Sequence, residues 1–562
     1  MHTIWKKSAV IVSILALLLA ASPAMIWADT QQPAAAKPNA QTLSKGIAAE
    51  VKSVLYERIF DGTRIGAVVR LYNNSTSVVR VPDYDIRITT ADGVTYTLQP
   101  STSNARSIQA KSKVELSYML TVNRTDAFAL SKLAWVDVNE EVYPKKETTV
   151  LSVNISKQVW NGPGSQITNS AAVKNWSDSF TIPVFNSPLT YTPVDFHQEN
   201  AAQDIVCVVT MKVENPGKFK EFVPDFSLDA VSELKDYAGS RIEKGSIALE
   251  PGETKEIHFA IPADRDEVIQ ALQVVTPEMY TYTGPDGLPA AIRYTVGRIR
   301  IGLPEQTVSL DQMKAYAYDT PIAFDPLNKV VNKQVGVSLV ELHMHENPDE
   351  GYQTAVAKFK LRNTGSLPIP VPEFQAQLIS KQGYTYSGVR QTLSERNLMP
   401  NLSYVVSYSF AVPKSETNDT FEMKILDDQT AAPYSAAIAA YKVGLQSEAD
   451  GSVMEFYPFS VKLSDWNLSS VFNSNGGGMY SYKLKLILDI TRKDDVVVNN
   501  SFSKMKIELV DNLGRTLGSK DLSFTGTDRL ISGDQTINFG NLQTDQLEFP
   551  VTIRIYEAID TP

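Results

Sequence analysis

The stretch between Ala355 and Phe374 carries the pattern that decides the fold. It contains Lys360-Leu361-Arg362-Asn363-Thr364-Gly365 and ends with Val371-Pro372-Glu373-Phe374. Apolar and polar residues alternate before Asn363, which is typical of a β-strand with one buried face. The stretch therefore predicts a strand that ends at Asn363, a short turn, and a second strand after the Val-Pro step.

The same pattern occurs twice upstream. Its asparagine recurs at Asn73 and Asn215, and its proline recurs at Pro82 and Pro224. Both anchors shift by 142 residues between the first and second copies and by 148 residues between the second and third. Two anchors that shift together indicate an internal repeat. A fourth, divergent copy is expected where Asn512-Leu513-Gly514 follows a strand, although that copy lacks the Val-Pro step.

Short alternating strands separated by Pro, Gly and Asn turns predict antiparallel sheets packed face to face, an all-β fold. One of the few helical patterns covers 264–272, with acids in its first turn. The expected organisation is a signal peptide over 1–28, a flexible linker over 29–45, and β-sandwich repeats over 46–187 with connector, 188–335 with connector, 336–450 and, in divergent form, 451–562.

These framework features resemble a known type of module. The Asn turn, the Val-Pro-acid-aromatic step and a later Phe-x-x-Pro strand, at Phe259 and Phe410, are similar to tandem immunoglobulin-like modules of uncharacterised Gram-positive bacterial secreted proteins. The resemblance covers about 46–450 well and 451–562 weakly. It implies about four immunoglobulin-like antiparallel β-sandwich domains. It implies no activity, so no functional residue is carried over.

The N-terminal sequence predicts secretion. Lys6 and Lys7 precede an apolar run over 9–21, and two small-residue sites for cleavage follow. This is the pattern of a signal peptide, and the run is too short to span a membrane. Cys207 is the only cysteine, so an internal disulfide is excluded. The net charge of −10 disfavours nucleic acid as a partner. We expect a secreted protein, extracellular or loosely associated with the cell wall, with no membrane span in the mature chain.

Few residues suggest chemistry. Cys207 shares the parity of its strand's apolar residues and is predicted to be a core side chain. His343 and His345 share one strand face with Glu341 and could hold two positions of a zinc site. The sequence identifies no third ligand, so a solvated polar face is the favoured interpretation and metal binding stays open. No catalytic residue, metal site or cofactor is predicted.

Aromatic residues in or near the segments between copies are the candidate ligand-binding residues. Such side chains can stack on sugar rings or anchor a protein partner. The alternative, which the sequence favours, is that they pack the joints between neighbouring repeats. The candidates are Trp160, Trp176, Tyr280 and Tyr282.

The leading hypothesis is a non-enzymatic secreted multi-domain protein that acts as an extracellular spacer, adhesion or cell-envelope interaction element. Its partner would be a protein or a cell-wall polysaccharide at the cell surface. The alternative is a carbohydrate-binding protein that uses its surface aromatics on a wall polymer. A third hypothesis, a hydrolase, requires a cleft with two acids about 5–10 Å apart. The ligand, the oligomeric state and the rigidity between repeats are left open.

Overall fold

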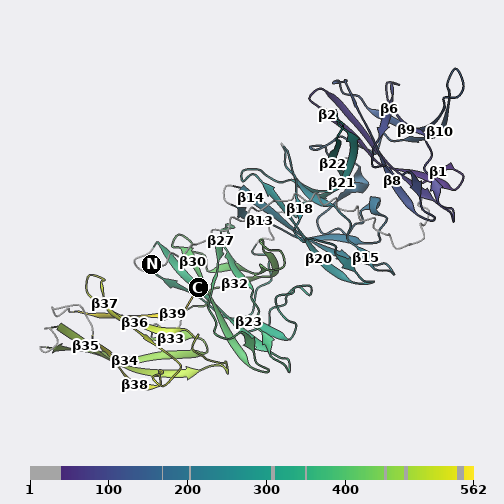
Figure 1. Ribbon diagram of the computed structural model, residues 1–562. Helices are drawn as coiled ribbons and strands as arrows, with labels where there is room; N and C mark the ends of the chain where they lie inside the picture. Colours follow the sequence, from purple (N-terminus) through teal and green to yellow (C-terminus); the bar gives the residue numbers. More distant parts are fainter. Residues whose placement is uncertain are drawn as a thin grey trace, which may run out of the picture. The chain divides into compact units, whose positions relative to one another are not determined.

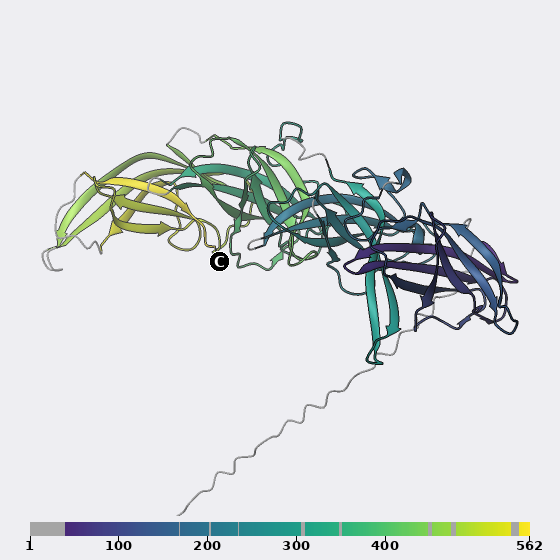
Figure 2. The ribbon, with the colours of Figure 1, turned by 90° about the horizontal axis from the view of Figure 1, so that it is seen from above.

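The computed structural model describes residues 40–167, 169–201, 204–233, 235–304, 310–347, 351–447, 452–473, 479–540 and 550–561. Within these ranges the chain forms 39 β-strands, two 3-10 helices of three residues each and no α-helix (Figures 1 and 2). The all-β prediction is therefore confirmed. The predicted signal peptide and most of the predicted linker lie outside the described residues. Among the described residues, we find no helix with the length and hydrophobicity needed to cross a membrane.

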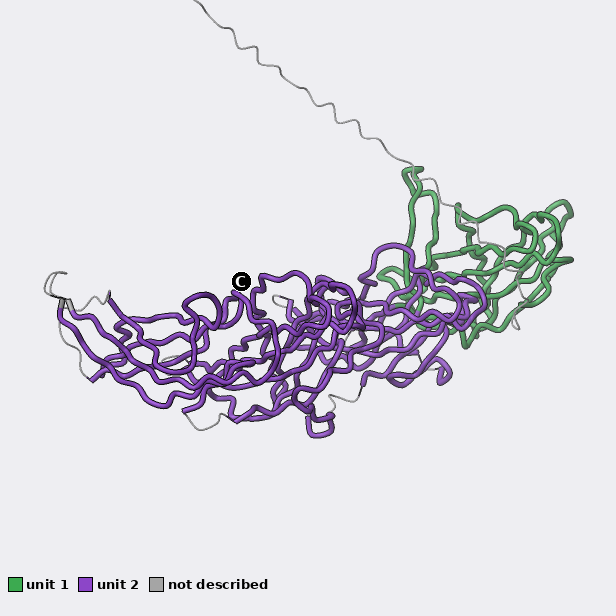
Figure 3. Tube along the Cα trace, turned by 90° about the horizontal axis from the view of Figure 1, so that it is seen from below, with its two compact units in different colours: residues 1–162, 278–296 green, residues 163–277, 297–562 purple. Residues whose placement is uncertain are grey.

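The chain divides into two compact units (Figure 3). Unit 1 comprises Met1–Gly162 together with Glu278–Val296, and unit 2 comprises Pro163–Pro277 together with Gly297–Pro562. The segment Glu278–Val296 is a hairpin that belongs to unit 1. It is formed by the end of β21 (Ala271–Thr283) and the start of β22 (Pro289–Gly302), and the rest of both strands belongs to unit 2. Unit 1 thus contains the first predicted repeat up to residue 162 together with this hairpin, and unit 2 contains the remainder.

Unit 1 is built on one nine-stranded sheet in the order β1-β2-β3-β8-β6-β5-β9-β10, with β11 paired to β2. Strand β6 pairs with both β8 and β5, so the two layers of the sandwich are joined along one edge. The strands are β1 Gln41–Ser44, β2 Ile47–Ile59, β3 Gly62–Asn73, β4 Val79–Arg80, β5 Asp85–Thr90, β6 Thr95–Pro100, β7 Ser107–Ile108, β8 Lys113–Val122, β9 Leu130–Asn139, β10 Lys146–Asn154 and β11 Val159–Trp160. The linker prediction is wrong for β1, because these residues pair with β2 and bury Leu43.

The second repeat packs the sheet β13-β14-β20-β18 against the sheet β12-β22-β21-β16-β17. Its elements are η1 Ser170–Ala172, β12 Val173–Lys174, η2 Pro183–Phe185, β13 Thr190–Ala201, β14 Asp204–Glu214, β15 Glu221–Phe222, β16 Ser227–Val231, β17 Asp236–Tyr237, β18 Ser240–Arg241, β19 Ala248–Leu249, β20 Thr254–Ala263, β21 Ala271–Thr283 and β22 Pro289–Gly302. Cys207 is fully buried in this core, as predicted, and burial raises the pKa of its thiol to about 11.

The third and fourth repeats also each pack two sheets around one core. The third uses β23 Val335–Glu346, β24 Tyr352–Asn363, β25 Ile369–Pro370, β26 Gln375–Ile379, β27 Thr385–Ser387, β28 Val389–Arg390, β29 Asn397–Leu398, β30 Ser403–Pro413, β31 Thr420–Asp427 and β32 Ala436–Gly444. The fourth uses β33 Val453–Phe456, β34 Phe459–Asn473, β35 Met479–Arg492, β36 Lys504–Val510, β37 Thr516–Leu522, β38 Gly533–Phe539 and β39 Thr552–Ala558.

Three sequence expectations are corrected by these cores. The predicted helix over 264–272 is not formed: irregular backbone there leads into β21, and Ile269 and Leu272 are buried in the second core. The connector assigned to the first repeat supplies Phe180 to the second core, and the connector assigned to the second repeat supplies Ile322 to the third core. Phe180 and Ile322 therefore pack into the repeat that follows their connector.

The repeated asparagine has the same role in three copies. Asn73, Asn215 and Asn363 are each fully buried at the end of a strand. The Nδ2 of each donates to the carbonyl oxygen four residues ahead, and its Oδ1 accepts from the backbone N–H two residues ahead. Nδ2 also donates to a carbonyl on the second strand of a two-stranded ribbon, β4–β7, β15–β19 or β25–β29. The side chain thus forms hydrogen bonds with backbone groups of the turn and of the ribbon that have no partner within a sheet.

The divergent fourth copy shares a different turn with two of the others. Gly93, Gly383 and Gly514 have φ angles of 88°, 87° and 82°, a left-handed conformation that glycine adopts without strain. In each turn the glycine N–H donates to the carbonyl of the residue three positions earlier, at distances of 2.9–3.1 Å. The backbone N–H of that earlier residue donates to the carbonyl oxygen of the first residue after the glycine. The hairpin turn at Gly287 has the same geometry, so this turn does not by itself identify a fourth copy, which stays a prediction.

Candidate functional site at the joint between the third and fourth repeats

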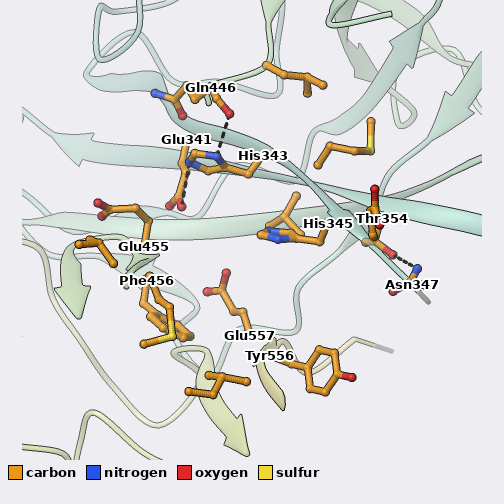
Figure 4. A pocket seen from close by; sticks show the side chains of 17 residues that line it. Glu341, His343, His345, Asn347, Thr354, Gln446, Glu455, Phe456, Tyr556 and Glu557 are labelled. Atoms are coloured by element: carbon orange, nitrogen blue, oxygen red, sulfur yellow. Dashed lines mark hydrogen bonds and ion pairs between the residues drawn. The ribbon is translucent and has the colours of Figure 1, made fainter. Parts of the chain in front are cut away.

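The strand pair His343 and His345, singled out by the sequence, lies at a covered joint. Glu341 and His343 are each only 6% exposed, so the expectation of a solvated polar face is wrong for these two residues. Residues of β33 and β39, from the fourth repeat, line a cavity together with this face of β23 (Figure 4). The outer face of the third repeat is polar because it meets another repeat.

Lys358 is the centre of the joint. It lies opposite Glu341 on the neighbouring strand β24 and is 1% exposed. Its Nζ lies 2.9 Å from Glu341 Oε2 and 2.8 Å from Glu557 Oε1, which comes from β39. Burial alone lowers the pKa of the ammonium, but the two carboxylates outweigh it and raise that pKa above its usual value. The side chain therefore stays charged and joins two repeats by ion pairs.

A cavity of about 700 Å³ opens beside this ion-pair cluster. Its polar walls include His343, His345, Glu455 and Glu557, and Figure 4 shows the Glu557 carboxylate directed toward the strand that carries the histidines. The His343 ring contacts the Gln446 carbonyl through Nδ1 at 3.1 Å. Among the described residues, no three His, Cys, Asp or Glu side chains are placed to hold a metal ion. The geometry therefore gives no support to a zinc site on the histidine pair.

Other contacts close the same joint. Lys360 Nζ lies 2.8 Å from Asp494 Oδ2, and the Tyr457 hydroxyl donates to the same oxygen at 2.5 Å. Backbone hydrogen bonds run from Val497 N to Ser403 O and from Thr392 N to Asp560 O, at 2.8 and 2.9 Å. Main-chain pairing combined with buried charges specifies one relative placement of the third and fourth repeats.

The joint brings two carboxylates close together on one buried ammonium. Because one ammonium touches both groups, the contacting oxygens of Glu341 and Glu557 lie within about 6 Å of each other. Hydrolysis by two carboxyl groups requires one of them to carry a proton as general acid. Here both carboxylates contact the same Lys358 ammonium. This arrangement suits a structural ion-pair cluster better than an acid–base pair.

The predicted aromatic residues are divided between the two units, with Trp160, Tyr280 and Tyr282 in unit 1 and Trp176 in unit 2. Trp160 in unit 1 is 6% exposed on β11, and Tyr280 is 8% exposed and stacked on Tyr282 with ring centroids 6.0 Å apart. Trp176 in unit 2 packs partly buried against the second core and contacts Phe196. Trp160 and Tyr280 are too buried to stack on a sugar. Their use as an exposed binding platform was therefore a wrong expectation, and the packing interpretation describes them better.

Tyr280 is buried because its hairpin is docked within unit 1. The neighbouring Thr281 accepts a hydrogen bond from Thr102 N through its carbonyl and donates its own N–H to Ser101 Oγ, both at 2.9 Å. On the same strand, Glu278 pairs with Lys52 Nζ at 3.1 Å. Sequence inspection missed these contacts, because nothing local in residues 278–296 marks them as part of the first repeat.

The second and third repeats are joined by a smaller polar network. His197 Nδ1 lies 2.7 Å from Asp195 Oδ2, and His197 Nε2 lies 3.3 Å from Glu199 Oε1. Glu199 Oε1 also accepts hydrogen bonds from the backbone N–H and the hydroxyl of Ser435, at 2.8 Å each. Burial alone lowers the pKa of His197, but its two carboxylate partners outweigh burial and raise that pKa to about 9. Charged His197 thus holds Glu199 in place against the third repeat.

This network predicts a pH dependence of stability. The pKa of histidine in the unfolded chain is about 6.5. The stability that protonated His197 contributes to the folded chain is therefore fully present below pH 6.5 and is lost as the pH rises through about 9. We expect the thermal midpoint of the mature chain to fall between pH 7 and pH 9.5, and to fall less in a His197→Gln variant. Scanning calorimetry measures the midpoints, and ¹³C NMR of the ring follows the titration. Equal slopes in both proteins, or a titration midpoint near 6.5, would contradict the assignment.

Comparison with known proteins gives little further information. No family model matches the chain. No curated protein matches it either. Solved structures that match include a protein of unknown function from Porphyromonas gingivalis W83, at 16% sequence identity, 46% coverage of this chain, 100% coverage of that chain and a TM-score of 0.14. At that TM-score the likeness supports no argument about this chain.

Proposed function

We propose that the chain is a non-enzymatic secreted protein of tandem immunoglobulin-like sandwiches, acting as an extracellular spacer, adhesion or cell-envelope interaction element. The supporting observation is the burial of Lys358 between Glu341 and Glu557. At this joint, Lys358 is held in ion pairs with one glutamate of its own repeat and one glutamate of the next repeat. A chain that presents binding surfaces at fixed spacing needs such joints.

The carbohydrate-binding alternative loses part of its support. Two of its four proposed contact residues, Trp160 and Tyr280, are buried. Exposed aromatic side chains do occur on the fourth repeat, where Trp466 is 40% and Phe472 is 53% exposed. These two residues lie on one long strand, β34, and could contact either a protein or a sugar polymer. We therefore keep the interaction role general and propose a partner at the cell surface.

A pull-down tests this function. The mature chain, immobilised by a C-terminal tag, is incubated with Gram-positive cell-wall fractions and with concentrated secreted proteins, with heat-unfolded chain as the control. We expect a wall polymer or a protein to be retained by the folded chain only, with no release of sugars or peptides from the wall fraction. Wall-polymer cleavage by the wild-type chain that is lost in a Glu557→Gln variant would show instead that the carboxylate pair is catalytic.

A further inference from the structure

A second cavity, of about 680 Å³, lies in unit 2 where the second repeat meets the third. One wall includes a cross-strand row on the sheet β13-β14-β20, formed by Asp195, Thr210 and His258. The facing wall comes from the third repeat, from segments 325–329, 427–430 and 436–438. Residues from both repeats therefore border one cavity that is partly open to solvent.

The walls of this cavity are acidic. Six carboxylates and two lysines line it: Asp195, Glu243, Glu253, Glu256, Asp325, Asp427, Lys255 and Lys329. Lys255 is already engaged, because its Nζ donates to Ala248 O at 2.7 Å and pairs with Glu253. Glu256 and Asp325, one from each repeat, form no ion pair among the described residues. Burial and then the charge of Asp325 raise the pKa of Glu256, while His258 and Lys329 act in the opposite direction and offset part of that rise.

Two buried polar atoms at the same wall also lack partners. Thr210 is 4% exposed and His258 is fully buried. Thr210 Oγ1 and His258 Nε2 have no hydrogen-bond partner among the described residues. Buried polar groups are otherwise almost always hydrogen-bonded, so an unpaired hydroxyl and ring nitrogen side by side indicate a missing partner. This observation is independent of the charge of the cavity.

The chemistry of the free atoms defines that partner. Glu243 Oε1 lies 2.7 Å from His258 Nδ1, and a carboxylate accepts the Nδ1–H. The carboxylates of Glu256 and Asp325 are acceptors too, and the Thr210 hydroxyl can accept. Carboxylates outnumber lysines six to two among the lining residues, and together with the Thr210 hydroxyl they favour a ligand group that carries only donors, which is an ammonium or a guanidinium.

We propose that this cavity binds a small organic cation, with its ammonium or guanidinium group between Glu256 and Asp325 and beside Thr210. A metal ion is the weaker choice, because no three ligating side chains among the described residues are placed for one. The cavity volume leaves room for an alkyl chain, as in a diamine or a basic amino acid. Since the two carboxylates belong to different repeats, the ligand couples the second repeat to the third. This goes beyond the proposed function and does not depend on it.

Calorimetric titration of the mature chain tests the proposal. The probes are 1,4-diaminobutane and arginine amide, with 1,4-butanediol as the uncharged probe of equal length. We expect saturable binding of at least one amine, none of the diol, and at least tenfold weaker amine binding in Glu256→Gln and Asp325→Asn. Glu508→Gln, a carboxylate change in the fourth repeat, should leave binding unchanged. No amine binding, or equal binding by the Glu256→Gln variant, would overturn the proposal, as would a calcium titration that binds where both amines fail.

A Thr210→Val variant keeps the test valid if the charge variants fold poorly. Valine matches threonine in shape and removes the unpaired hydroxyl. We expect the thermal midpoint without ligand to stay equal or rise, while the amine affinity falls several-fold. If the hydroxyl has only a structural role, its removal would lower the thermal midpoint and leave the amine affinity unchanged. That result would count against the site.

Discussion

A Lys358→Met variant is expected to lose about 3–5 kcal/mol of unfolding free energy at the joint between the third and fourth repeats. The substitution removes the ammonium but leaves the Glu341 and Glu557 side chains, which are 7% and 8% exposed, without a counter-charge. The chain has several cores and is not expected to unfold in one step. Hydrogen exchange on peptides from β24 and β39, followed through a urea series, measures the joint directly.

The charge argument has two controls. A triple variant, Lys358→Met with Glu341→Gln and Glu557→Gln, removes all three charges and is expected to recover most of the loss, because an uncharged joint of similar volume carries no desolvation penalty. Lys360→Met removes a more exposed ion pair at the same joint and should cost about 1 kcal/mol. If Lys358→Met unfolded like the wild type, or the triple variant fared no better than the single one, the buried ion pair would not be what holds the joint.

Local patterning predicted the interior of each repeat well. Side-chain parity before Asn363 assigned the buried face of β24, and Cys207 was placed in a core by the same reasoning. These predictions succeed because strand alternation is decided by neighbours within a few residues. The glycine turn at Gly514 was also recognisable, because its left-handed backbone restricts the residue choice.

The outer faces were predicted less well, for a physical reason. Alternation shows that Glu341, His343 and Lys358 point away from the core of their own repeat, and a polar residue there is ordinarily solvated. The strand that covers them, β39, lies about two hundred residues later in the chain. No local signal reports such a partner. The burial of Tyr280 has the same origin, since the first repeat that receives its hairpin lies far upstream.

The helix expected over 264–272 illustrates a different error. Acids at the start of a segment favour a helix N-terminus, but this preference is weak compared with burial of apolar side chains in a sheet. Leu272 pairs within the sheet opposite Ala230 and is fully buried. Tertiary packing therefore overrode the local signal, whereas the cavity walls at Thr210 and His258 carried no sequence signal at all.

The second large effect is expected from Asn363→Ala, at the residue that organises the repeated stretch. Its Nδ2 donates to Leu367 O and Leu398 O at 2.8 Å each, and its Oδ1 accepts from Gly365 N at 2.8 Å. The side chain is fully buried, so alanine would leave three backbone groups without partners at about 1–3 kcal/mol each. We expect a loss of about 3–5 kcal/mol, enough to unfold the third repeat under mild urea.

The repeat supplies its own comparison for this prediction. Asn215 makes the same three hydrogen bonds in the second repeat, so Asn215→Ala should selectively destabilise the second core, and Asn363→Ala the third. Asn397→Ala, at an exposed position of β29, removes an amide of the same size and should cost less than about 1 kcal/mol. Hydrogen exchange resolved by repeat distinguishes these outcomes. Equal protection of β24 in the wild type and in Asn363→Ala would show that the turn forms without the asparagine. The recurrence of this residue would then need an explanation other than its hydrogen bonds to the backbone.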